Sequence, residues 1–395
     1  MLRNRIYLAV VSGHFIVDVL NATGAVLLAV LATPLGLSNA QIGTALTIYL
    51  LIGSLSQPLF GWLADRMPDR AMQLAALSVL WMAVFYTLVA LAPNWSLLLP
   101  VFLLAPLGSG LFHPIGAAAA GSVVPERAAS ATSIFFFCGQ IGLAVGPFVA
   151  GALAGQFGAP GIIPLSLAAL APAGLLLFAG RAVATPVSKG PAKPRSREVL
   201  KIGTLLIVAF VALVAVRSSI QSVYQSFLPK LFSDRGWEPA LFGLMAGTFM
   251  GAGAIGQVIS GVAADRLGMR AVIIWPLLAS VPAGLLCLLS PTAPAAFIGC
   301  ALSGLLVGGQ HSVLVVYAQR LLPVKQGFAA GLILGFTFAS GAVGTWIVGQ
   351  LADSAGLQQV MLGVTLLGLP AALLALGLPG RLHKEAPVPS AAAAD

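Results

Sequence analysis

Long apolar segments with few charges make up most of this chain. Of its 395 residues, 59% are apolar and 8% are charged, whereas a water-soluble domain carries about 25% charged residues. So few charges cannot cover the surface of a soluble protein of this length, so the solvent for most of that surface must be lipid. The composition therefore predicts a protein that lies within a lipid bilayer.

The apolar residues fall into twelve segments that are long enough to cross a membrane. A spanning helix needs about 20 mostly apolar residues, and such helices tolerate glycine and proline. The first segment is too long for the core of a cleaved signal peptide, so we interpret it as a spanning helix. An all-α membrane protein is predicted, with transmembrane helices over residues 6–32, 41–64, 72–92, 95–122, 128–155, 159–180, 201–228, 238–265, 271–291, 294–321, 326–351 and 357–379.

Basic residues predict the orientation, because positively charged loops stay in the cytoplasm. The loops on one side of the membrane contain only two basic residues, Lys230 and Arg235. Both termini are therefore expected on the other, cytoplasmic side of the plasma membrane, which is the inner membrane of a bacterium. The net charge of +9 is spread over short loops, so no nucleic-acid partner is expected. The basic residues assigned to the cytoplasm are Arg3, Arg5, Arg66, Arg70, Arg127, Arg181, Lys189, Lys193, Arg195, Arg197, Lys201, Arg266, Arg270, Arg320, Lys325, Arg381 and Lys384.

The sequence lacks the signatures of an enzyme. It contains no Walker-type phosphate loop, no H-E-x-x-H motif and no G-x-S-x-G elbow. Cys138, Cys287 and Cys300 lie inside apolar runs without partners at metal-ligand spacing, so neither a metal site nor a disulfide is predicted. No cofactor is predicted either. Without a nucleotide-binding domain, any work that the protein does across the membrane would have to draw on a gradient of ions or of a solute.

The two halves of the chain resemble each other. Residues 61–66 (GWLADR) end the second predicted helix, and residues 261–266 (GVAADR) end the eighth. His113 precedes Pro125 by the same spacing with which His311 precedes Pro323. Two similar halves of the same orientation imply a pseudo-twofold axis along the membrane normal. We predict a six-helix bundle over residues 1–180, a cytoplasmic linker over 181–200, a second six-helix bundle over 201–380, and a disordered cytoplasmic tail over 381–395.

Residues 61–70, GWLADRMPDR, resemble the signature between helices 2 and 3 of the major facilitator superfamily, G-x-L-x-D-R-x-G-R-R. The second copy, GVAADRLGMR, keeps more of the end of that pattern, whereas Pro68 and Asp69 depart from it in the first copy. The resemblance covers nearly the whole chain and implies a facilitator fold. It also implies that these acidic and basic residues tie helix ends together on the cytoplasmic side. The gating residues so assigned are Asp65, Arg66, Arg70, Asp265 and Arg266.

Within that superfamily the chain looks most like the fosmidomycin-resistance type of efflux protein. Three segments carry the likeness: HFIVD with Asn21 in helix 1, FHP at 112–114 in helix 4, and SIF followed by glycines in helix 5. The arginine-bearing motif of helix 4 found in many proton-coupled drug exporters is missing, and His113 lies in that helix instead. Helix 5 also resembles the antiporter signature, and its expected packing or hinge residues are Gly142, Gly146, Pro147 and Gly151.

Ionisable residues inside the predicted helices mark a candidate site, since each charge in hydrocarbon costs about 2.5–3.5 kcal/mol on insertion scales. Away from helix ends they are His14, Asp18, His113, Arg217 and His311, which lie on helices 1, 4, 7 and 10. In the fold that the resemblance implies, these helices line the central cavity. With polar neighbours at helical spacing, the predicted substrate- and proton-binding residues are His14, Asp18, Asn21, His113, Arg217, Gln221, Tyr224, Gln310 and His311.

Structural roles for these residues also stay open. Asp18 and Arg217 could form a fixed ion pair between helices 1 and 7, which could also serve as a gate. The sole role of His14 could be to orient Asp18 by a hydrogen bond. His113 and His311 could be ordinary interhelical hydrogen-bonding groups. Tyr224 could be a packing residue.

Three functions are compatible with this sequence. The favoured one is a monomeric secondary transporter that moves a small polar or anionic organic solute or drug out of the cell by alternating access, coupled to protons. The second is an importer or uniporter of a small organic anion through the same cavity. The third is a membrane receptor or assembly factor that does not transport.

Overall fold

The computed structural model of the chain describes residues 4–123, 127–180, 204–321 and 326–379. All regular structure in these ranges is helical, and twelve segments are long and apolar enough to cross a membrane. The predicted all-α membrane fold with twelve spans is therefore confirmed. The predicted linker over 181–200 and tail over 381–395 lie outside the described residues.

Six spans form the N-terminal half, and several of them consist of consecutive helices. Its elements are α1 (Arg5–Leu35), α2 (Asn39–Leu55), α3 (Gln57–Arg66), η1 (Pro68–Arg70), α4 (Ala71–Ala90), α5 (Trp95–Leu104), α6 (Pro106–Ser122), α7 (Ala128–Phe157), η3 (Ala159–Ile162), α8 (Ile163–Ala168) and α9 (Leu170–Gly180).

Six further spans form the C-terminal half, and one of them contains a π-helical turn, η4. Its elements are α10 (Thr204–Asp234), α11 (Pro239–Leu267), α12 (Met269–Leu289), α13 (Ala293–Ser303), η4 (Gly304–Gly308), α14 (Gln310–Leu321), α15 (Gln326–Ala355), α16 (Leu357–Leu366) and α17 (Gly368–Leu376).

Local sequence signals set where the first helices begin and end. The Asn4 side chain accepts hydrogen bonds from two of the first amides of α1, which have no partner within the helix. Gly36 ends α1 with φ of 60°, a left-handed conformation that glycine adopts without a steric penalty. Ser38 and Gln41 then form a reciprocal capping box that begins α2. The short, polar connection between the first two spans is thus specified locally.

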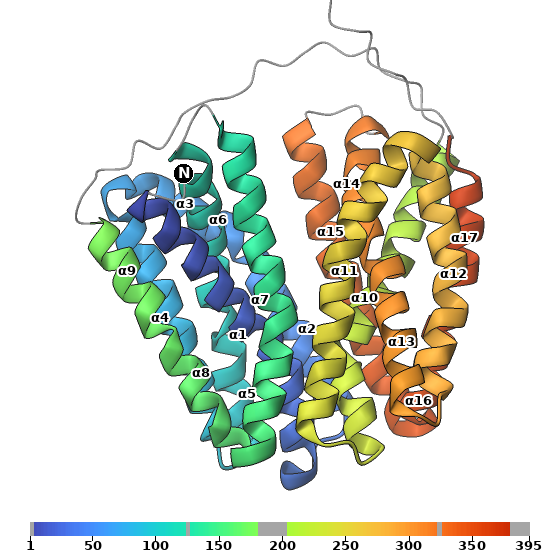
Figure 1. The fold of residues 1–395 in the computed structure, drawn as a ribbon, viewed down its shortest axis with the longest axis horizontal. Coiled ribbons are helices and arrows are strands. Elements are labelled where there is room, and N and C mark those ends of the chain that lie inside the picture. The colour runs from blue at the N-terminus through green and yellow to red at the C-terminus, as the bar shows by residue number, and fades with distance from the viewer. Residues whose placement is uncertain (1–3, 124–126, 181–203, 322–325, 380–395) are drawn as a thin grey trace, which may run out of the picture.

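The helices form two bundles that stand side by side (Figure 1). Between the bundles, α7 packs along α11 and α2 packs along α15. These two helix pairs correspond to each other under the internal repeat, because α2 is the counterpart of α11 and α7 is the counterpart of α15. The predicted arrangement of two six-helix bundles related by a pseudo-twofold axis is confirmed.

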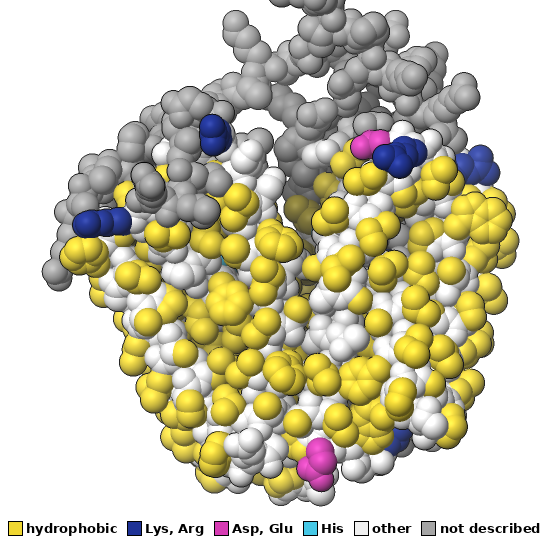
Figure 2. Space-filling model, viewed as in Figure 1, with side chains coloured by type: hydrophobic (Ala, Val, Ile, Leu, Met, Phe, Trp, Pro, Cys, Tyr) yellow, Lys and Arg dark blue, Asp and Glu magenta, His cyan; other side chains and the backbone are white. Residues whose placement is uncertain are grey.

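The bundles contact each other at the end that carries the α1–α2 and α15–α16 connections. There the Asp353 carboxylate of α15 accepts hydrogen bonds from the backbone amides of Asn39 and Ala40, at 2.8 and 3.1 Å. The Thr47 hydroxyl donates to the Ala342 carbonyl across the same interface. At the opposite end the bundles diverge (Figure 1), and the space-filling view is hollowed between them (Figure 2). The structure is therefore closed at one end and open at the other.

Close contact between α1 and α7 organises the N-terminal bundle. A Cβ atom at Gly142 would overlap the Phe15 carbonyl oxygen, and one at Gly146 would overlap the Val19 carbonyl oxygen. Glycine at these positions lets the two backbones approach each other, which is how small residues promote helix association in membranes.

Adding a methyl group at this contact should destabilise the protein. We expect Gly146→Ala to cost about 1–3 kcal/mol of stability, because the α1 backbone cannot yield easily. Thermal unfolding of the purified protein in detergent measures the effect. Gly363→Ala on α16 is the matched control, because a Cβ there meets no atom within 4 Å. Equal unfolding temperatures for the two variants would contradict this view of the α1–α7 contact.

Removing the Asp353 carboxylate should favour opening of the closed end. Loss of a helix-capping group costs about 1 kcal/mol. Asp353→Ala should therefore raise, by roughly fivefold, the ratio of molecules that are open at the Asp353 end to molecules that are closed there. Spin labels at Leu59 of α3 and Val262 of α11, both exposed, report the distance between the bundles in a background without native cysteines. Asp234→Ala is the control, because that carboxylate pairs with Lys230 of its own helix. An unchanged distance distribution in Asp353→Ala would refute the role of this contact.

Candidate functional site

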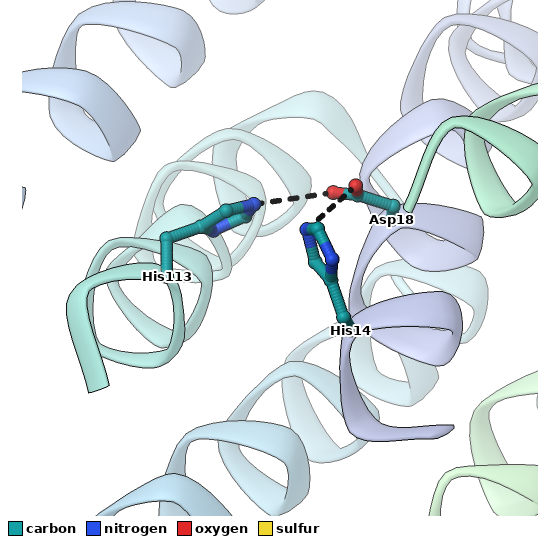
Figure 3. A group of neighbouring side chains, drawn as sticks. All are labelled: His14, Asp18 and His113. Atoms are coloured by element: carbon teal, nitrogen blue, oxygen red, sulfur yellow. Dashed lines mark ion pairs between the residues drawn. The ribbon is translucent and has the colours of Figure 1, made fainter. Parts of the chain in front are cut away.

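A buried carboxylate lies between two imidazoles inside the N-terminal bundle (Figure 3). His14 and Asp18 lie one helical turn apart on α1, and the His14 Nε2 is 3.2 Å from the Asp18 Oδ2. His113 approaches from α6, with its Nε2 at 3.5 Å from the Asp18 Oδ1. The side chains of His14 and Asp18 are 3% and 8% exposed, whereas that of His113 is 22% exposed. His113 is therefore the member of this cluster that solvent reaches most easily.

Backbone carbonyls hold both imidazoles in place. The Nδ1 of His14 lies 2.7 Å from the Phe135 carbonyl oxygen on α7, and the Nδ1 of His113 lies 2.8 Å from the Ser109 carbonyl oxygen on α6. The His14 ring also stacks on the Phe135 ring, with centroids 3.9 Å apart. In both imidazoles the Nε2 atom is thus directed at the carboxylate.

A chain of hydrogen bonds supports the carboxylate from the other side. The Asn21 amide donates to the Asp18 Oδ1 at 3.1 Å and to the Ser109 hydroxyl at 2.9 Å. The Tyr49 hydroxyl of α2 donates to the Asn21 Oδ1, and it lies 2.9 Å from the Tyr86 hydroxyl of α4. Four helices therefore converge on Asp18 through side chains.

Gly139 leaves the space that this cluster occupies. A Cβ atom at that position of α7 would overlap the His14 ring and the Asp18 carboxylate. The same glycine-lined face of α7 therefore shapes both the helix packing and the site.

Arg217 occupies a separate environment in the C-terminal bundle. Its guanidinium donates to the Val307 carbonyl oxygen, at 3.1 Å from Nε, and to the Gly308 carbonyl oxygen, at 3.2 Å from Nη2. Both carbonyls belong to the π-helical turn η4, where the regular helical hydrogen-bonding pattern is interrupted. The predicted ion pair between Asp18 and Arg217 is absent from this conformation, since Asp18 pairs with the two histidines and Arg217 with backbone carbonyls.

Two of the other predicted site residues in the C-terminal half, Tyr224 and Gln310, are buried, and two, Gln221 and His311, are partly buried. His311 is partly buried and lies close enough to Arg217 to interact with its charge. Gln310 is fully buried, and its Oε1 has no partner among the described residues. Tyr224 points into the bundle, where its hydroxyl bonds to Thr365, so it lies with packing residues. Gln221 is partly buried.

The predicted gating residues lie at the open end. Arg66 stacks over the Trp62 ring at 3.9 Å. Within the described residues, none of these side chains forms an ion pair across the two bundles. That agrees with a conformation in which the bundles are apart at this end (Figure 1). The predicted gating residues are all exposed, namely Asp65, Arg66, Arg70, Asp265 and Arg266. Asp65 and Arg66 end α3, Arg70 is the last residue of η1, and the other two lie near the end of α11.

The predicted helix 5 residues of α7 contact two different partners. Gly142 and Gly146 pack on α1 within the N-terminal bundle, as described above. Pro147 and Gly151 lie against Gly243 of α11 in the other bundle. α7 thus connects the site helix α1 to the interface between the bundles.

Several residues of the site were not found from the sequence. Ser109 precedes His113 by one helical turn, a spacing that could have revealed it. Tyr49, Tyr86 and the Phe135 carbonyl come from helices far apart in the sequence, and no local pattern brings them to Asp18.

The ligand atoms of His14, Asp18 and His113 lie within 4.8 Å of one another, so these residues could bridge a small metal ion. The sequence predicted no metal. The His14 Nε2 and the Asp18 Oδ2 are already at hydrogen-bond distance, so a shared proton suffices to join them. We therefore treat the cluster as a proton-binding group.

The fold and the site define a membrane transporter built from two repeated six-helix bundles. The sequence profile of the Major Facilitator Superfamily matches residues 10–230 and 210–394. The chain therefore belongs to this superfamily, whose members are transporters and not enzymes. The expected family is confirmed, and the protein is a multi-pass membrane protein.

Comparisons with individual proteins agree with this assignment. The chain is 28% identical over 390 residues to the fosmidomycin resistance protein of Escherichia coli, covering 95% of this chain and 93% of that protein. It is 26% identical to the multidrug efflux pump Tap of Mycolicibacterium fortuitum, over 70% of this chain and 71% of that protein. In fold it is similar to a bacterial homologue of the lysosomal transporter Spinster in an inward-facing conformation, with a TM-score of 0.75, 16% identity and coverage of 93% and 95%.

Arg217 should prove necessary for stability because it satisfies the carbonyls of η4. We expect Arg217→Met to lower the free energy of unfolding by about 1–3 kcal/mol, the cost of leaving buried polar groups unpaired. Thermal unfolding measures this, and Gln221→Leu, one turn along the same helix, is the control that should change little. An unchanged unfolding temperature in Arg217→Met, together with lost solute binding, would instead assign Arg217 to the substrate alone.

Proposed function

We propose that this protein is a secondary exporter of a small polar or anionic organic solute or drug, driven by protons that move inward. The observation that carries the proposal is the buried Asp18 carboxylate between two imidazoles. Ionisable groups at this depth in a membrane are costly and mark proton or substrate pathways. Histidine changes its charge near neutral pH, which suits it to a cycle of proton uptake and release.

The location and orientation follow from the basic loops. With both termini in the cytoplasm, the open end of the structure faces the cytoplasm of a bacterial cell, and the protein resides in the inner membrane. The bundles would then rock to close this end and to break the Asp353 contact at the other end. The gating residues Asp65 and Arg66 would form their contacts when the cytoplasmic end closes.

Arg217 favours a substrate with a negative charge. No carboxylate among the described residues neutralises this buried guanidinium; its partners are carbonyl dipoles. An anion that enters between the bundles would supply the missing charge. The likeness to the fosmidomycin resistance protein supports an organic anion as solute and export as the direction, and that to Tap supports drug efflux.

An importer or uniporter of a small organic anion is the second candidate, because the same residues could serve either direction. The division of the site between a proton-binding cluster and a separate cation favours coupled exchange. A receptor without transport has less support, since both the contact at the closed end and the gating residues at the open end suit alternating access.

Transport in proteoliposomes with an imposed pH gradient tests the proposal, with fosmidomycin as the first solute. Asp18→Asn should lower gradient-driven flux at least tenfold, because an amide cannot bind and release the proton, while exchange of labelled for unlabelled fosmidomycin should persist. Asp234→Asn, an acidic residue outside the site, is the control.

Unchanged gradient-driven flux in Asp18→Asn would remove the proton role. Counterflow that runs equally fast without any ion gradient in the wild type would favour the uniporter. Where fosmidomycin gives no flux at all, a thermal-shift screen of organic anions, sugars and cationic drugs selects the next solute, and absence of flux for every stabilising compound would favour the receptor.

A further inference from the structure

We infer that the His14–Asp18–His113 cluster holds two exchangeable protons in this conformation. A carbonyl oxygen only accepts hydrogen bonds, so we assign a hydrogen to both Nδ1 atoms that face carbonyls. The Ser109 hydroxyl also lies 3.2 Å from the His113 Nδ1, but the Ser109 carbonyl oxygen is nearer, at 2.8 Å. The Nε2 atoms, at 3.2 and 3.5 Å from the carboxylate oxygens, are therefore the positions that gain or lose a proton. This inference deepens the proposed function, on which its role in transport rests.

Counting donors gives the number of protons. An ionised carboxylate only accepts, and a neutral imidazole with hydrogen on Nδ1 presents a lone pair at Nε2. Without added protons, a nitrogen lone pair would face an oxygen lone pair in both the His14–Asp18 and the His113–Asp18 contact. One added proton would form a hydrogen bond in only one of these contacts. Two protons satisfy both contacts, either on both imidazoles or on one imidazole and the carboxyl group. In either distribution the cluster has a net charge of +1.

No neighbouring group replaces these protons. Asn21 donates to the Asp18 Oδ1 and has no charge. Tyr49 of α2 and Tyr86 of α4 are neutral phenols that bond to each other and to Asn21. From α7 the cluster meets the Phe135 ring and carbonyl and the backbone at Gly139. Among the described residues, no lysine or arginine pairs with Asp18, so its charge is balanced by protons.

The two protons hold α6 against α1 at the cluster. Loss of both would leave two lone pairs facing an ionised carboxylate, so α6 would separate from α1 at His113. The imidazole that is 22% exposed provides the route by which protons leave. An exchange of two protons for one singly charged anion would move charge across the membrane, so the membrane voltage would drive export together with the pH gradient.

Solid-state NMR on protein labelled with ¹⁵N-histidine and ¹³C-aspartate in liposomes tests the count. The chain has four histidines, and His14→Gln and His113→Gln assign the two relevant rings. At pH 7 we expect the Nε2–H groups of these rings and the carboxyl hydrogen of Asp18 to total two. His311→Gln is the control and should leave the count unchanged, since that histidine lies in the other bundle.

Asp18→Asn sharpens the test, because an amide nitrogen can donate to one imidazole while its oxygen accepts from the other. This variant should therefore retain one of the two protons. A wild-type total of zero or one overturns the inference, and that measurement needs no variant that could misfold.

The outcomes for this count and for the proposed function are separable. A total of two protons without gradient-driven transport supports the two-proton cluster and rejects the proposed proton-driven exporter. A total of one proton, together with transport that depends on Asp18, rejects the two-proton cluster and supports the exporter. Fosmidomycin flux that does not respond to an imposed voltage contradicts the two-proton exchange for that solute.

Discussion

The close approach of α1 to α7 is the contact on which the site depends. Gly139, Gly142 and Gly146 bring the α7 backbone against α1, which carries His14 and Asp18. Only at this separation can the Phe135 carbonyl reach the His14 ring and fix its orientation. Larger residues on this face would separate the helices and leave a buried carboxylate without its partner, which is costly in a low-dielectric environment. Packing and chemistry therefore require the same small residues.

The two repeated halves have acquired different electrostatics on one architecture. The N-terminal bundle places a carboxylate between two imidazoles, so its charge can be balanced by protons. The C-terminal bundle holds Arg217 on the carbonyls of a π-helical turn and places His311 nearby. His113 and His311 correspond in the repeat, but among the residues that the structure describes only His113 meets an acid. Separation of a proton-binding half from a cationic half allows the two to respond to different ligands while the bundles move as units.

Much of the fold could be predicted from the sequence, because hydrophobic length and loop charge are local properties. The twelve spans, the repeat and the grouping of His14 with Asp18 on one helical face were all accessible in this way. The pairing of Asp18 with His113 instead of Arg217 was not, because it depends on which helices become neighbours and how deep each lies. The two carbonyls that bind Arg217 belong to the π-helical turn that follows α13, and the glycine-rich sequence there does not reveal that turn.

α7 links the proton cluster to the interface between the bundles. One face of this helix packs on α1 at the cluster, and Gly151 farther along contacts Gly243 of α11 in the other bundle. A change in protonation that alters how α1 packs on α7 would therefore be transmitted to the end where the bundles meet. At that same end Asp353 caps α2, which carries Tyr49 into the network around Asp18. Two helices of the N-terminal bundle thus contact both the buried site and the closed interface, so a rigid-body movement of that bundle couples one to the other without any long chain of side chains.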